Sequence, residues 1–116
     1  YGELGSTWFL VSRRPEEAAH VVGTLLRCVG EDRIVWGTDS IWYGPPQSLI
    51  DAFRAFTIPE WMQERFGYPP LTAEAKQKVL STNAAALYGI DVDRVRRAES
   101  VAWLETTRAE LADRLP

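Results

Sequence analysis

The most regular hydrophobic pattern in the chain lies between residues 15 and 30. Apolar residues recur there at the three- and four-residue spacings of one helix face: Ala18, Val21, Val22, Leu25, Leu26 and Val29. Pro15 suits the first turn of a helix, Glu16 and Glu17 suit its positive end, and Gly30 is a typical C-terminal cap. The pattern predicts an amphipathic helix over this stretch.

Two short apolar segments flank that helix, at residues 1–5 and at Ile34–Trp36. The second ends in Gly37-Thr38-Asp39-Ser40, and a short apolar run closed by turn residues is typical of a buried parallel strand. A strand, a helix and a strand joined by short connections predict a right-handed βαβ crossover. We therefore expect Asp39 at the carboxyl edge of a parallel sheet, where α/β folds bind ligands. Residues 6–10 and 41–46 are expected as loops at that edge.

The rest of the chain carries helical patterns and no further strand. We predict helices from Gln47 to Phe56, from Pro59 to Phe66, after a Thr72 cap, from Asn83 to Tyr88, and from Asp91 to about Leu115. The fold class expected from this order is α/β, followed by a helical C-terminal segment.

Composition narrows the class of protein. The 116 residues are 46% hydrophobic and 25% charged with a net charge of −3, which excludes a disordered chain and a basic nucleic-acid footprint. No apolar run is long enough to suggest a membrane span. The single cysteine, Cys28, is expected to be a structural thiol in a reducing, cytoplasmic setting. The start at Tyr1, in the middle of a predicted strand, and the five tryptophans lead us to expect a piece of a larger protein.

Asp39 is the main candidate for chemistry, and two interpretations stay open from its position alone. It is either a turn residue that satisfies its own backbone or a carboxylate that serves a ligand site. Trp42 and Tyr43, in the loop after it, either line a substrate pocket or fill the core. Ser6, Thr7 and Trp8 lie in the corresponding loop after the first strand, as weaker candidates.

Other polar residues have simpler interpretations. His20, one position from the apolar stripe, is expected to be a surface or partly buried side chain that pairs with Glu16. A buried Glu3 would need a partner, which the sequence does not identify. A cluster of arginines on the last helix is expected to be a solvated face, with binding of an acidic partner as the alternative: Arg94, Arg96 and Arg97.

Several short motifs occur in a particular order along residues 1–90. They are Tyr1-Gly2-Glu3-Leu4-Gly5-Ser6, Trp36-Gly37-Thr38-Asp39-Ser40, Trp42-Tyr43-Gly44, Ile58-Pro59-Glu60, Tyr68-Pro69-Pro70-Leu71 and Asn83-Ala84-Ala85-Ala86-Leu87-Tyr88-Gly89. This set resembles the C-terminal part of the metal-dependent amidohydrolase family, in the branch of amidohydrolase 2 that includes aminocarboxymuconate-semialdehyde decarboxylase-like enzymes.

The resemblance implies a fold and a reaction class. Residues 1–90 would be the C-terminal fragment of a (β/α)8 TIM barrel, with its last two parallel strands, and residues 91–116 would form a long C-terminal helix. The parent enzyme would hydrolyse an amide, ester or lactone, or decarboxylate a small carboxylic acid without oxidation. Its partners would be a small-molecule substrate and a second copy of the chain or the rest of the barrel, with no nucleic acid and no membrane.

The resemblance also assigns roles to residues. Asp39 would be the catalytic residue and a ligand of a divalent metal, zinc by expectation, while Ser40, Trp42, Tyr43 and Trp8 would contact the substrate. The family's metal-binding histidines are not found in this sequence, so we expect this chain to be inactive alone. The alternative is a non-catalytic helical scaffold or partner-binding module derived from the same fold.

Overall fold

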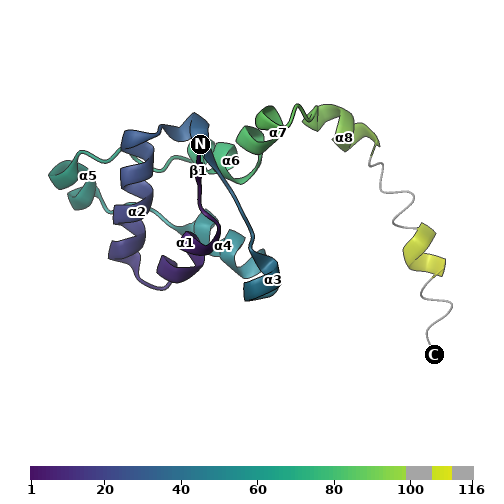
Figure 1. Ribbon diagram of the computed structural model, residues 1–116, viewed down its shortest axis with the longest axis horizontal. Helices are drawn as coiled ribbons and strands as arrows, with labels where there is room; N and C mark the ends of the chain where they lie inside the picture. The colour runs from purple at the N-terminus through teal and green to yellow at the C-terminus, as the bar shows by residue number, and fades with distance from the viewer. Residues whose placement is uncertain (99–105, 111–116) are drawn as a thin grey trace.

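The computed structural model describes residues 1–98 and 106–110 (Figure 1). Its elements are β1 (Gly2–Glu3), α1 (Gly5–Val11), α2 (Pro15–Cys28), η1 (Glu31–Arg33), β2 (Ile34–Val35), α3 (Ser40–Tyr43), α4 (Gln47–Ala55), α5 (Glu60–Phe66), α6 (Ala73–Gln77), the π-helix η2 (Lys78–Thr82), α7 (Asn83–Leu87) and α8 (Val92–Ala98). Residues 106–110 are also helical. None of the helices within these ranges is both long and apolar enough to cross a bilayer.

The predicted strand, helix and strand are confirmed. β1 and β2 pair in parallel, with Gly2 opposite Ile34 and Glu3 opposite Val35, and α2 connects them. Each strand is only two residues long, although the Leu4 amide extends the pairing by donating to the Val35 carbonyl at 3.1 Å. Because the described residues form a sheet of two strands, each strand keeps one unpaired edge.

Helix α2 packs through the apolar face that the sequence predicts. Its buried residues include Ala18, Val22 and Leu26, and its acidic first turn suits the helix dipole. Gly23 lies on the same face, where an added Cβ would be 2.4 Å from Cγ of Tyr68. The absence of a side chain at Gly23 therefore allows the segment after α5 to lie directly on α2.

One hydrophobic core joins these elements. Its most deeply buried large side chains come from the strands and from α1, α2, α4, α5 and η2: Leu4, Trp8, Val22, Ile34, Phe53, Met62 and Val79. Figure 1 shows the sheet and helices α1 to α7 grouped together, with α8 extending away from them. The buried members of the core lie between Leu4 and Val79 in the sequence.

Two predicted loops are wrong, because each contains a helix. Residues 5–11 form α1, whose buried residues Gly5, Trp8 and Val11 follow at three-residue spacing on one helix face. Residues 40–43 form the single turn α3, closed by a bond from the Trp42 amide to the Asp39 carbonyl at 2.9 Å. Helix α1 starts one residue after β1, and α3 starts four residues after β2.

The C-terminal helices agree in part with the predictions. Thr72 caps α6 by accepting from the Ala75 amide at 3.1 Å, as predicted. Asn83 is buried and its amide donates to the carbonyls of Glu31 and Ile34, at 2.6 and 2.7 Å. The predicted helix from Asp91 to Leu115 is described only at residues 92–98 and 106–110; its other residues lie outside the described ranges.

Candidate functional site

Asp39 follows the carboxyl end of β2 after a connection of three residues, Trp36 to Thr38, and has φ 46° and ψ 29°. It is the one non-glycine residue with a positive φ among those the structure describes. Aspartate tolerates this left-handed conformation better than most residues, because its short polar side chain bonds locally. The conformation starts α3 at once, so the Asp39 carboxylate stands near the carboxyl edge of the sheet.

A chain of hydroxyl groups leads to that carboxylate. The Ser6 hydroxyl donates to Oδ2 of Asp39 at 2.5 Å, and the Tyr43 hydroxyl donates to Oγ of Ser6 at 3.1 Å. The Tyr43 ring stacks on Phe9 with centroids 3.8 Å apart, which holds it over α1. The first helix and the turn after β2 therefore fix the Asp39 side chain from two sides.

A second carboxylate lies beside Asp39. Oε1 of Glu3 accepts the Gly5 amide at 2.6 Å. A Cβ added at Gly5 would lie 2.6 Å from this oxygen and 2.8 Å from Oδ2 of Asp39, so both carboxylates border the same small space. A Cβ added at Gly37 would lie 1.7 Å from Oε1 of Glu3. Glycine at both positions makes room for the Glu3 carboxylate at the sheet edge.

The expected substrate contacts fall into different environments. Trp8, expected in a loop at the open edge, is 1% exposed in α1, and its indole N–H donates to the Leu49 carbonyl at 3.0 Å. This corrects its placement, because Trp8 is a core residue packed on Phe53 with ring centroids 5.0 Å apart. Trp42 is 76% exposed and therefore does not fill the core.

Ser40 and Tyr43 remain close to Asp39. The Thr38 hydroxyl donates to Oγ of Ser40 at 3.4 Å, and Tyr43 is half-buried. Together with the hydroxyl chain from Tyr43 through Ser6, they surround Asp39 with groups that both donate and accept hydrogen bonds. Such a setting suits a carboxylate that handles protons.

The described residues do not complete a metal site. No group of three or more His, Cys, Asp or Glu side chains converges within residues 1–98 and 106–110. Glu3 and Asp39 offer hard oxygen ligands near one point, but a catalytic zinc usually needs three protein ligands and an open position. Any metal held by Asp39 would therefore draw further ligands from other residues.

The remaining candidates lie away from this edge. Nδ1 of His20 is 2.8 Å from the Tyr68 hydroxyl, so this bond replaces the expected pair with Glu16. Cys28 is exposed at the end of α2, which corrects its interpretation as a structural thiol. Neither residue takes part in the hydrogen bonds that hold the Glu3 and Asp39 carboxylates.

Sequence reasoning missed Glu3, which was left without a partner. Ser6 was a weaker candidate in the loop after the first strand, with no bond assigned to it. The available signal was their position, since both follow or end a strand parallel to the one that ends before Asp39. Residues at the carboxyl ends of neighbouring parallel strands meet at one edge.

Comparison with known proteins identifies the family. Searches of curated proteins and of solved structures found no match to this chain. The model of the amidohydrolase family matches residues 6–90, a stretch that includes Ser6 and Asp39. Members of this family are hydrolase-like enzymes that generally depend on a metal. The chain therefore belongs to the amidohydrolase family.

Proposed function

We propose that this chain provides the last two strands of a (β/α)8 barrel hydrolase, with Asp39 at its catalytic metal site. The observation that carries the proposal is the Asp39 carboxylate, held by Ser6 at the carboxyl edge of two parallel strands. In TIM barrels the catalytic residues lie at that edge. The unpaired edges of β1 and β2 fit strands that continue into a larger sheet.

The chemistry proposed for Asp39 is proton transfer. A carboxylate at this position accepts a proton from water that attacks a carbonyl group, and returns it to the leaving group. The Ser6 hydroxyl donates to Oδ2 and so fixes the orientation of the carboxylate. Because the described residues do not complete a metal site, a divalent metal, zinc by expectation, belongs to the proposal only as a group that Asp39 helps to bind.

The proposed substrate class is supported by the family to which the chain belongs. We propose a small amide, ester or lactone, or a small carboxylic acid that loses carbon dioxide. Ser40 and Tyr43 would contact the substrate beside Asp39, and the exposed ring of Trp42 would cover it. Trp8 is left out of this set, because its ring is packed in the core.

The first experiment measures the intact mass of the natural protein that contains this sequence. A TIM barrel needs about 250 residues, whereas this chain has 116 residues and a mass of 13.1 kDa. We expect a mass of at least twice that of the chain. A natural protein of 13.1 kDa without hydrolase or decarboxylase activity would contradict the proposal.

The second experiment tests Asp39 in that natural protein. We expect Asp39→Asn to lower kcat/KM by about 100-fold or more, because amide oxygen does not accept the proton. Asp51→Asn is the matched control, since Asp51 is an exposed aspartate of α4 outside the site. Equal activity of both variants would exclude Asp39 as the catalytic residue.

The second candidate function is a non-catalytic partner-binding module. It is favoured by the exposed apolar side chains of α3, where Ile41 is 86% and Trp42 is 76% exposed. Such side chains mark interaction surfaces when they cluster. Metal analysis separates the two functions, because the module would contain no stoichiometric metal in the natural protein.

A further inference from the structure

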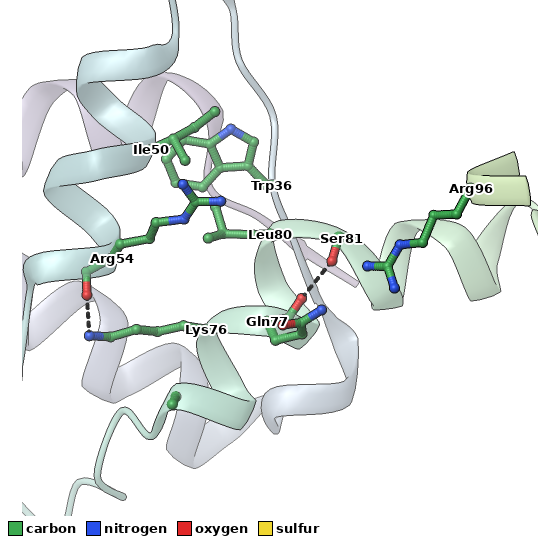
Figure 2. A pocket seen from close by; sticks show the side chains of 9 residues that line it. Trp36, Ile50, Arg54, Lys76, Gln77, Leu80, Ser81 and Arg96 are labelled. Atoms are coloured by element: carbon green, nitrogen blue, oxygen red, sulfur yellow. Dashed lines mark hydrogen bonds between the residues drawn. The ribbon is translucent and has the colours of Figure 1, made fainter. Parts of the chain in front are cut away.

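A second site lies between the C-terminal helices, away from Asp39. A cavity of about 660 Å³ opens between α4, α6, η2 and α8 (Figure 2). Its lining residues are Trp36, Ile50, Arg54, Ala73, Lys76, Gln77, Leu80, Ser81 and Arg96. Asp39, Glu3 and Ser6 do not line it, so the cavity is separate from the site described above.

The charged residues of the cavity all have the same sign. Arg54, Lys76 and Arg96 line it, and no aspartate or glutamate does. Figure 2 shows Arg54 and Arg96 on opposite sides of the space, with Lys76 below. Nη1 of Arg54 also lies 3.7 Å from Oδ1 of Asp51, with both side chains about 60% exposed. An exposed pair of this kind is weak, so it leaves most of the positive charge uncompensated.

Lys76 is held in place at the cavity wall. Its Nζ donates to the Arg54 carbonyl at 2.6 Å, which joins α6 to the end of α4. Burial lowers the pKa of Lys76 from its ordinary value. An anion in the cavity would offset this loss of hydration by favouring the charged ammonium group.

The remainder of the cavity is apolar. Trp36, Ile50 and Leu80 form one side of it, and the Trp36 ring also packs on Phe53 with centroids 5.4 Å apart. Nε1 of Trp36 is buried without a hydrogen-bond partner among the described residues. A ligand that fits this lining has a flat or short apolar body and a negative group.

We propose that this cavity binds a small organic anion, a carboxylate attached to an aromatic ring or a short acyl chain. The carboxylate lies between Arg54, Lys76 and Arg96, and its apolar body lies on Trp36 and Leu80. Guanidinium groups favour carboxylates because their paired N–H donors match the two oxygens. The net charge of the chain is −3, so a general attraction of anions to the molecule does not explain the binding.

The test uses the natural protein that contains this sequence and 1-naphthoate as the probe, with 1-naphthalenemethanol as the neutral analogue. Binding is followed by two-dimensional ¹H–¹⁵N NMR of the indole N–H groups, with the Trp36 signal identified by its loss in Trp36→Phe. We expect saturable, submillimolar binding that shifts the Trp36 signal, and binding of the alcohol that is weaker by about tenfold or more.

Substitutions of the two arginines test which positive charges bind the carboxylate. We expect Arg54→Gln and Arg96→Gln each to weaken 1-naphthoate binding by about fivefold, with little effect on the alcohol. Arg13→Gln, an exposed arginine that does not line the cavity, is the matched control and leaves binding unchanged. Equal binding of acid and alcohol, equal binding by all three variants, or no shift of the Trp36 signal at saturation would each overturn the proposal.

Discussion

At the scale of single residues, the Glu3 carboxylate rests against two glycines. Oε1 of Glu3 would be 1.7 Å from a Cβ at Gly37 and 2.6 Å from a Cβ at Gly5. The same oxygen accepts the Gly5 amide, so its position depends on the bare backbone at both sites. The arrangement at the sheet edge therefore requires three particular residues together.

The contact between Glu3 and Gly37 predicts that substitutions at these two residues have non-additive effects on stability. Gly37→Ala is expected to lower the free energy of unfolding by about 1–2 kcal/mol, because the new methyl group displaces the Glu3 side chain. In a Glu3→Ala background the same change should have a smaller effect, because the displaced atoms are gone. Urea denaturation of the four proteins measures the coupling.

Gly30→Ala serves as the control for this pair. Gly30 has φ 82° and open space around its Cα, so alanine there strains the backbone without meeting Glu3. The change in unfolding free energy caused by Gly30→Ala should be the same with and without Glu3→Ala. Additive effects of Gly37→Ala and Glu3→Ala would contradict the predicted contact.

Residue-scale chemistry was only partly predictable from the sequence. The place of Asp39 followed from the order of strand, helix and strand, which the hydrophobic pattern reveals. Its bond to Ser6 joins residues 33 positions apart and depends on the start of α1, which the sequence does not indicate. The left-handed backbone at Asp39 has no sequence signal that distinguishes it from an ordinary turn.

At the scale of elements, Asn83 connects α7 to the sheet. Its side-chain amide donates to the carbonyls of Glu31 and Ile34, so one buried group satisfies two backbone acceptors. We expect Asn83→Leu to lower the free energy of unfolding by about 2–3 kcal/mol, because both carbonyls lose their donor. Urea denaturation measures this, with the exposed Ser81→Ala as the control.

Lys78 connects η2 to the turn before β2. Its Nζ is 2.6 Å from Oε1 of Glu31 and 2.8 Å from Oδ1 of Asp32. The hydrogen bond to Asp32, and after it the hydrogen bond to Glu31, raises the pKa of Lys78 above its ordinary value. A raised pKa means that the folded chain holds the proton more tightly. The stabilisation is therefore present below the unfolded pKa, about 10.4, and is lost as the pH rises above it.

The matching prediction concerns Lys78→Met. The variant should melt at a lower temperature than the parent chain at pH 7 and 9, and the difference should shrink as the pH rises beyond about 10.4. Thermal melts followed by circular dichroism at several pH values measure this. A difference that stays constant up to the highest pH at which the parent folds would show that the ion pairs do not stabilise this connection.

The elements differ in how well the sequence predicts them, for physical reasons. The helices at Pro15–Cys28 and Gln47–Ala55 repeat their apolar positions over several turns, so both were predicted. Helices α1 and α3 have seven and four residues, too few for a period to show. The π-helical turn between α6 and α7 depends on packing against β2 and η1 and leaves no pattern in the sequence.

At the scale of the whole molecule, the chain leaves strand edges and apolar side chains uncovered. Each of its two strands has an unpaired edge in the described part of the chain, and Ile41 and Trp42 expose most of their apolar surface. We expect the isolated 116-residue chain to self-associate, because open edges and exposed apolar side chains favour pairing with other copies. Sedimentation velocity across a range of protein concentrations measures the association.

A double variant tests which feature causes the association. Replacing Ile41 and Trp42 by serine removes exposed apolar surface without changing the strands. Reduced association would assign it to α3, and unchanged association would assign it to the strand edges. A chain that stays monomeric at high concentration and melts in one cooperative transition would contradict the prediction altogether.

The left-handed backbone at Asp39 has a consequence for anyone who engineers this chain. Folding alone would favour glycine at φ 46°, since glycine adopts that conformation without strain. A redesign that ranks substitutions by stability would therefore tend to propose Asp39→Gly, and would remove the carboxylate that Ser6 holds at the sheet edge. Stability therefore favours glycine at this residue, whereas the proposed activity requires aspartate.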